Sequence, residues 1–349
     1  MRPVRARRRW LAAAAAGALL AGLPGTAFAW GTPGASNGQK TETSGTRDGA
    51  GLVSKVVYRG STSGSRGSDG RGALQPVGDW TPPACWYEPR SAEQFRDYVE
   101  SVYEETVNTP GQHSYAKQSV GMFREDYKDG TYKNYNLDKK DEGSFWVAVR
   151  DEDRRMEPEA QACDKMPFWV ENGDPVPVEN AVTPEVLAEL AYNRVRLPAA
   201  EVTLRPDAAT KVNLPTWAWL DKATFKETSV TASIAVGGLN IQATTTARPV
   251  SLRLEPGTPD AETYPASGEC TIDADGSIGE PYTRGQAERT PPCGLKYLRS
   301  SGDGTFTLRA TITWEISWTG TGGAGGDLPD GTFGNDQAVT VQEIQSVNR

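Results

Sequence analysis

The sequence contains one histidine, His113, among its 349 residues, and it has no Gly-x-x-x-x-Gly-Lys-[Ser/Thr] phosphate-binding loop. A Ser-His-Asp or Cys-His arrangement would have to use this residue as its base, and a multi-histidine zinc centre is excluded. The surrounding stretch, residues 109–114, favours a surface-loop position for His113 over a catalytic one. The absences therefore predict no catalytic residue, no metal and no cofactor, and the interpretation leans away from an enzyme.

Long hydrophobic runs are also missing after the first thirty residues. Residues 1–29 combine a basic stretch, an apolar run from Leu11 to Leu23 and small residues at Ala27 and Ala29, which is the layout of a secretory signal peptide. The apolar run is shorter than the roughly 20 residues of a membrane-spanning helix. We expect cleavage after Ala29, no transmembrane segment afterwards and secretion to the extracellular side. Residues 7–11 also fit the twin-arginine pattern, so general export is favoured but the route stays open.

Negative charge dominates the rest of the chain. The formal net charge is −8, and loss of the five arginines in residues 1–29, which hold no acidic residue, leaves −13. Nucleic acids and anionic membranes are bound by basic surfaces, so neither is expected as a partner.

Cysteine is scarce, but the four that occur all follow the expected leader. They are Cys85, Cys163, Cys270 and Cys293. An even number of cysteines in an exported chain predicts disulfides, and four cysteines allow three pairings. We predict Cys85–Cys163 and Cys270–Cys293, because each pair then lies within one folded unit.

The remaining chain divides into three expected segments. Residues 30–78 are rich in Gly, Ser and Thr and are predicted to be a disordered tail, because they cannot bury enough apolar surface. Within that tail, residues 52–58 have the composition of a strand, and pairing with a sheet edge is the alternative there. Residues 79–198 are predicted to be a small α+β module, with a helix capped by Ser91, a strand over 144–149 and a helix that starts at Thr183-Pro184.

Residues 199–349 are predicted to form an all-β sandwich. Thr305 to Trp318 alternate strictly between apolar and polar side chains, which indicates a strand with one buried face. Gly237-Gly238 joins two further alternating runs and predicts a hairpin. With shorter strands near 202–204, 250–254, 294–297 and 339–344, about seven strands and no helix are typical of a sandwich.

Four stretches of this second part resemble a known group of proteins. They are residues 212–221, 292–297, 310–318 and 341–345, and the module shares only its opening, residues 80–89. The group consists of uncharacterised exported actinobacterial proteins with an immunoglobulin- or PKD-like β-sandwich domain at the C-terminus. The resemblance covers residues 199–349 and implies this type of sandwich and an extracellular address. The group has no assigned activity, so no catalytic residue follows from the resemblance.

Two loops imitate ligand-binding motifs. Gly320 to Gly325 match the dinucleotide fingerprint, but Gly326-Asp327-Leu328-Pro329 follows instead of a helix, so a flexible loop after a strand is expected. Asp273 to Ser277 begin like a calcium loop, but Thr283 stands where the last acidic ligand is needed. A polar turn is the expected structure there.

The remaining candidates for binding are aromatic residues in proline-bounded segments: Trp80, Trp86, Tyr87, Trp217 and Trp219. Their rings either stack on a sugar or a partner's apolar group, or, as is favoured, fill the ends of the cores. The leading functional hypothesis is a non-catalytic binding or scaffolding protein of the cell exterior whose partner is an unknown envelope protein or glycan. The alternative is a secreted hydrolase that acts on cell-wall glycan or extracellular polysaccharide through two carboxylates on facing walls of a cleft.

Overall fold

A computed structural model describes residues 57–60, 72–151, 153–197, 202–206, 209–220, 225–273 and 276–344. The expected signal peptide, residues 1–29, lies outside these ranges. The described chain is α+β, with a helical segment followed by mostly antiparallel sheets. Its helices are α1 (Ala92–Asn108), α2 (Ser114–Lys128) and α3 (Pro184–Tyr192), with 3-10 turns η1 (Lys133–Lys139), η2 (Pro158–Gln161) and η3 (Thr321–Gly323).

The described strands form four sheets, and the strands are named in their order across each sheet. The three-stranded sheet is β4 (Cys85–Arg90), β5 (Gly143–Arg150) and β6 (Phe168–Glu171). The long sheet is β1 (Val57–Gly60), β11 (Thr228–Val236), β12 (Leu239–Glu255), β16 (Phe306–Gly320), β17 (Gly325–Gln342) and β3 (Gln75–Pro76), with β14 (Glu269–Thr271) beside β12 and β9 (Ala209–Lys211) beside β17. The four-stranded sheet is β13 (Ala261–Tyr264), β15 (Gly294–Tyr297), β10 (Thr216–Trp219) and β8 (Thr203–Arg205); β2 (Gly72–Ala73) pairs with β7 (Arg196–Leu197).

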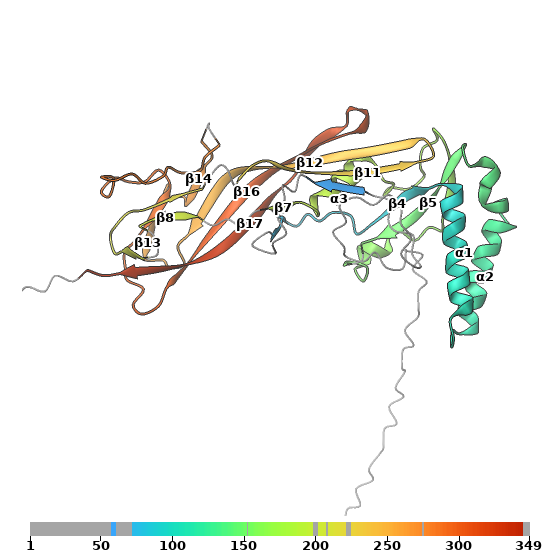
Figure 1. Ribbon diagram of the computed structural model, residues 1–349, viewed down its shortest axis with the longest axis horizontal. Helices are drawn as coiled ribbons and strands as arrows, with labels where there is room; N and C mark the ends of the chain where they lie inside the picture. Colours follow the sequence, from blue (N-terminus) through green and yellow to red (C-terminus); the bar gives the residue numbers. More distant parts are fainter. Residues whose placement is uncertain are drawn as a thin grey trace, which may run out of the picture. The chain divides into compact units, whose positions relative to one another are not determined.

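Helices α1 and α2 run side by side next to β4 and β5 (Figure 1). The predicted helix after Ser91 is present: the Ser91 side chain accepts a hydrogen bond from the backbone N–H of Gln94, and the Gln94 side chain accepts one from the N–H of Ser91. Phe95 of α1 stacks on Phe145 of β5 with ring centroids 4.1 Å apart. The helical hairpin therefore covers one face of the three-stranded sheet with aromatic contacts.

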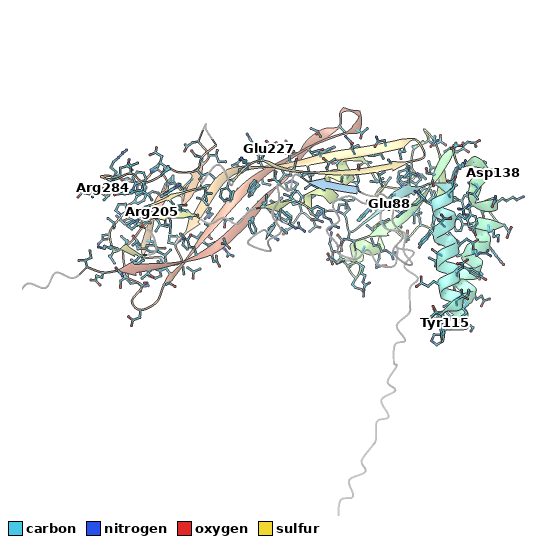
Figure 2. The ribbon with its side chains drawn as sticks, viewed as in Figure 1. Glu88, Tyr115, Asp138, Arg205, Glu227 and Arg284 are labelled. Carbon is cyan, nitrogen blue, oxygen red and sulfur yellow. A yellow bond between two sulfur atoms is a disulfide. The ribbon has the colours of Figure 1, made fainter. Side chains whose placement is uncertain are left out.

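An ion pair is buried on that covered face. Glu88 and Arg90 of β4 contact each other directly, and their side chains are 0% and 2% exposed. The indole N–H of Trp86 also donates to Glu88, with Nε1 and Oε2 3.4 Å apart. Figure 2 shows Glu88 on the strands beside the hairpin. Removing a charged group from water costs desolvation free energy, and here the ion pair and the hydrogen bond offset that cost.

The alternation predicted for Thr305 to Trp318 is confirmed in β16, where every second side chain from Leu308 to Trp318 is buried. The Gly237-Gly238 hairpin is also confirmed; both glycines have positive φ, 53° and 85°, as the mirror-image hairpin turns require. The strands expected separately near 239–241 and 250–254 are one strand, β12. A register shift between Pro249 and Ser251 lets this strand continue through a proline.

Helix α3 packs against the long sheet. It contacts β11, β12 and β16, and the hydroxyl of Thr245 donates to the carbonyl oxygen of Ala188 over 2.8 Å in a buried position. The helix belongs to the segment predicted as residues 79–198, and the strands belong to 199–349. Side chains of both segments thus share one hydrophobic core.

Part of the segment expected to be disordered is folded. Val57 to Gly60 form β1 at the edge of β11, and residues 72–76 contribute β2 and β3. Residues 72–76 are ordered by two close contacts with β17. A carbon added at Gly331 would lie 2.3 Å from Cγ of Leu74, and one added at Gly72 would lie 1.7 Å from the ring of Phe333. Each glycine thus leaves room for a large side chain of the other segment.

The glycine-rich stretch after β16 is also more ordered than expected. Residues 321–323 form the turn η3, as a loop after a strand should, but β17 begins at Gly325 and pairs with β16 along nearly its whole length. No helix follows the glycines in this described stretch, so the dinucleotide fingerprint has no structural counterpart.

Both predicted disulfides are confirmed. Cys85 is bonded to Cys163, and Cys270 is bonded to Cys293. Two buried disulfides suggest an oxidising environment, which points to the outside of the cell. Within the described ranges, no helix has the length and hydrophobicity to span a membrane.

Candidate functional site

A pocket of about 320 Å³ opens where the three-stranded sheet meets the β11–β12 hairpin and the start of α3. The residues that line it come from three parts of the chain: Ser144, Trp146, Val170, Glu171, Asn172, Gly173, Asp174, Val176, Val182, Thr183, Pro184, Leu239 and Ile241. The volume lies at the lower end of the range for small-molecule sites, about 300–1,000 Å³.

Two glycines allow neighbouring walls of the pocket to approach each other closely. Gly143 at the start of β5 leaves no space for a side chain, since an added carbon would lie 2.4 Å from the carbonyl oxygen of Val170 in β6. At the hairpin turn, an added carbon on Gly237 would lie 3.3 Å from the hydroxyl of Ser144. The turn thus sits against the first residues of β5, and the strand that leaves it places Leu239 and Ile241 on the pocket wall.

The interior of the pocket is apolar. Trp146 and Val170 contribute buried side chains from the sheet, and Val182 contributes another from the segment before α3. Leu239 and Ile241, half-buried, form the wall supplied by β12. Such a surface gains free energy when an apolar group displaces water from it, by roughly 25 cal/mol for each Å² buried.

Two acidic residues, Glu171 and Asp174, are among the lining residues. Both are exposed; Glu171 is the last residue of β6, and the backbone N–H of Asp174 in the following turn donates to its carbonyl oxygen over 3.1 Å. None of the described lining residues is Lys or Arg. The nearby ammonium of Lys165 donates instead to the carbonyl oxygen of Pro177, 2.7 Å away. Because side chains alternate along β6, the Glu171 side chain lies on the sheet face opposite Val170.

One polar group of the wall has no internal partner. Ser144 is 5% exposed, lines the pocket, and its hydroxyl makes no hydrogen bond to any described residue. Ser144 pairs with Val170 across the β5–β6 ladder, so these two side chains lie on one face of the sheet, opposite the face of Gly143 and Glu171. The hydroxyl oxygen is not among the fully buried polar atoms without a partner, so it is accessible from the pocket, where a ligand or a water can form a hydrogen bond with it.

The five aromatic candidates do not line the pocket. Trp86, Tyr87 and Trp217 are buried, with the phenol of Tyr87 accepting a hydrogen bond from the backbone of Lys165. Trp80 packs edge-on against Tyr192 with ring centroids 5.0 Å apart, and Trp219 is half-exposed in β10. Burial leaves the first three no free face for a ligand, so they occupy the core positions that were favoured from the sequence.

His113 lies at the turn between α1 and α2. Its exposed ring stacks on Tyr115 with centroids 5.7 Å apart, and its side chain makes no hydrogen bond to a described residue. Figure 2 shows Tyr115 at the outer end of this helical hairpin. No described carboxylate orients the imidazole, so the geometry of a catalytic triad is not formed around it.

The other loop candidates are turns. In the stretch that begins like a calcium loop, the N–H of Gly276 donates to the carbonyl oxygen of Asp273 over 2.9 Å, and Ala274 and Asp275 lie outside the described residues. Among the described residues, no group of three or more His, Cys, Asp or Glu side chains is placed to hold a metal ion.

One carboxyl outside the pocket has a strongly shifted pKa. Burial of Glu189 on α3, together with the negative charge of Glu185 one turn earlier, raises its pKa to about 7. The Glu189 carboxyl is therefore protonated at a higher pH than an ordinary glutamate. Because burial on α3 causes the shift, its titration reports the packing of α3.

Sequence reasoning did not find the pocket. Its walls come from residues 144–146, 170–184 and 239–241, and no local pattern indicates that they meet. Comparison with known proteins finds no matching family model, no similar curated protein and no similar solved structure. The functional argument therefore rests on the geometry of the site itself.

Proposed function

We propose that this chain is a non-catalytic binding protein of the cell exterior that holds a small ligand in the pocket between β5, β6 and β12. The observation that carries the proposal is a pocket whose buried lining side chains are apolar apart from Ser144, while its other polar lining residues are exposed. Ligand sites of soluble proteins have this composition: apolar walls for affinity and a few polar groups for orientation. The ligand is either a free small molecule or a group carried by an envelope protein or glycan.

The alternative, a glycan hydrolase, fits the same pocket less well. Both glycosidase mechanisms need two carboxyl groups on opposite sides of the scissile bond, roughly 5–10 Å apart. Glu171 and Asp174 instead lie within one turn of the chain, and β12 supplies Leu239 and Ile241 rather than a carboxylate. Among the described lining residues, no second acidic group lies across from the first pair.

We also propose an immunoglobulin- or PKD-like sandwich for the C-terminal part and export by the leader in residues 1–29, in line with the resemblance to exported actinobacterial proteins. Two observations support the sandwich. The Cys270–Cys293 bond joins β14, in the long sheet, to the residue before β15, in the four-stranded sheet. Side chains of both sheets, such as Leu252 and Leu295, are completely buried in the same core.

The isoleucines offer a direct test of binding. The chain has seven isoleucines, and of these Ile241 alone lines the described pocket. Mature protein with ¹³C-labelled isoleucine δ1 methyl groups would be screened by NMR against several hundred fragments, with the Ile241 signal assigned from an Ile241→Val variant. We expect a set of fragments to shift this signal saturably and to lose their effect in a pocket-filling Leu239→Trp variant. A screen that shifts no methyl signal, or shifts only others such as Ile278, would refute the pocket as a binding site.

Hydrolysis is tested on the same preparation. Mature protein would be incubated with purified cell-wall sacculi and with soluble polysaccharides, and new reducing ends would be counted. We expect no release above the blank. Release that disappears in Glu171→Gln or Asp174→Asn variants would replace the binding proposal with the hydrolase.

A further inference from the structure

We infer that the pocket selects an uncharged ligand: an aliphatic or aromatic body that carries one hydrogen-bonding group, such as a hydroxyl or a carbonyl. The inference rests on the proposed function, because it requires the pocket to be a binding site. It adds the chemical class of the ligand and the side chain that orients it, which is Ser144.

The register of the three-stranded sheet decides which side chains face the pocket. Ser144 pairs with Val170 across β5 and β6, and Trp146 lies two positions further along β5, so these three side chains share one face. All three line the pocket. Glu171 lies on the opposite face, the face of Phe145, which α1 covers. The sheet therefore presents apolar groups and one hydroxyl to the pocket, and no charge.

The buried part of the wall offers no counter-charge to a ligand. Its side chains are those of Ser144, Trp146, Val170 and Val182. An ionised group that entered there would lose its hydration without gaining a charged partner, and this costs far more than the loss of one neutral hydrogen bond. Asp174 also lines the pocket, but its side chain is exposed, so water and salt screen its charge. A neutral group of the same shape is therefore preferred.

The half-buried side chains that complete the pocket are also apolar. They are Val176 after β6, Pro184 at the start of α3, and Leu239 and Ile241 of β12. A sugar ring placed among them would lose the hydration of several hydroxyls, and Ser144 is the one side-chain hydroxyl among the buried lining residues able to replace it. An alkyl or phenyl group makes no hydrogen bonds with water, so it loses none on entry.

The hydroxyl of Ser144 matches one polar group of the ligand. Its side chain is 5% exposed and makes no hydrogen bond to a described residue, and its oxygen is accessible from the pocket. A hydroxyl both donates and accepts, so it bonds equally to a ligand hydroxyl or carbonyl. The turn at Gly237 lies close by, where an added carbon would be 3.3 Å from this oxygen. The hydrogen bond therefore directs the polar end of the ligand toward the β11–β12 turn.

The test compares three probes of one shape: 4-phenylbutanol, 4-phenylbutylamine and 4-phenylbutyrate. An alkylamine has a pKa near that of lysine, about 10.4, and a carboxylic acid has one near that of glutamate, about 4.3, so only the alcohol is neutral at pH 7. Dissociation constants would be measured from the shift of the Ile241 methyl signal in 50 mM and 500 mM NaCl. We expect the alcohol to bind at least tenfold more tightly than either charged probe. Its constant should change less than twofold with salt, because no ion pair contributes.

A series of alcohols measures contact with the apolar walls. From 2-phenylethanol through 3-phenylpropanol to 4-phenylbutanol, the affinity should rise about three- to fourfold for each methylene, which is the effect of burying one such group. A constant that stays the same along the series would place the chain of the ligand in water and would overturn the apolar body.

Variants test the role of Ser144. Ser144→Ala should weaken 4-phenylbutanol binding about 2- to 5-fold, through the loss of one neutral hydrogen bond. The matched control is Ser229→Ala, which removes the hydroxyl of a half-buried serine in β11, outside the pocket lining, and should leave the constant unchanged. Glu171→Gln/Asp174→Asn removes both acidic groups of the lining and should leave alcohol binding within twofold. Equal effects of the two serine variants would overturn the orienting role of Ser144.

The outcomes separate the two proposals. Equal binding of the three probes, or tighter binding of the amine or the acid than of the alcohol, overturns the neutral class and leaves the binding pocket standing. If the three probes fail while other fragments shift the Ile241 signal, those fragments decide the class: uncharged ones support it and charged ones overturn it. Failure of all three probes together with an empty fragment screen overturns both proposals.

Discussion

The contact between Leu74 and Gly331 allows a sharp test of the fold, because it ties residues expected to be disordered to the long sheet. Leu74 is 7% exposed and lies over Gly331 of β17. Leu74→Ala should lower the free energy of unfolding by about 2–3 kcal/mol, near the lower end for a buried leucine, since short strands can relax into the space. Gly331→Val should cost about 1–3 kcal/mol, because its side chain would collide with Leu74.

The two changes together should be less harmful than their sum. In Leu74→Ala/Gly331→Val the valine occupies the space that the leucine leaves, and we expect a favourable coupling of about 1–2 kcal/mol in a double-mutant cycle. Urea unfolding followed by circular dichroism measures all four proteins. Val77→Ala, at a side chain 53% exposed, is the matched control and should stay within about 0.5 kcal/mol. A Leu74→Ala effect equal to this control, or strict additivity in the cycle, would refute the packing of residues 72–76 on β17.

Three further predictions concern single features of the described structure. Cys293→Ser opens the bond to Cys270, which spans 23 positions, and should cost about 3–4 kcal/mol in urea unfolding without reductant; an unchanged midpoint would contradict a stabilising bond. Arg90→Met should cost about 3–5 kcal/mol by removing the cationic partner of the buried Glu88 carboxylate, and Glu88→Gln/Arg90→Met should recover at least half of this; a double variant no better than the single one would count against the ion-pair account. The pKa of Glu189 is raised to about 7 from 4.5, so its contribution to stability is full below pH 4.5 and is lost as the pH rises through 7. Relative to Glu189→Gln, the wild type should lose about 1 kcal/mol between pH 4.5 and 7.5, a value reduced because the side chain is partly exposed; parallel stability curves for the two proteins would exclude the shift.

The elements that could be predicted from the sequence are those whose signal is local. Helix α1 carries its cap at Ser91, and β16 repeats its apolar side chains with a period of two from Leu308 to Trp318. The within-unit pairing of the cysteines was also found, because it needs only the rough position of each unit. Each of these signals lies within a short stretch or depends on simple exclusion.

Helix α2 was missed although a signal existed. Its buried residues Ala116, Val120, Phe123 and Tyr127 follow helical spacing, but many charged residues separate them and His113 supplies no side-chain cap at the start. Without a capping residue the first turn has no local marker. Counting the spacing of the four apolar positions would have found the helix.

The remaining elements depend on partners that are distant in the sequence. β17 has the glycine, aspartate and proline content of a loop, yet it is a strand because β16 supplies its hydrogen bonds and Leu74 fills the space above Gly331. β1 is likewise defined by its pairing with β11. The pocket could not be predicted for the same reason: its lining residues, such as Ser144, Glu171 and Ile241, come together only when the three-stranded sheet packs against the β11–β12 hairpin.

The most direct measurement is the Ile241 methyl signal during a titration of the mature protein with the fragment that shifts this signal most in the screen. Among the seven isoleucines, the Ile241 signal should shift saturably, and the signals of the others should stay within the noise. The shift should vanish in the Leu239→Trp variant, whose indole fills the pocket. Saturable binding that moves other isoleucines and leaves Ile241 unchanged would contradict the claim that this pocket is the binding site.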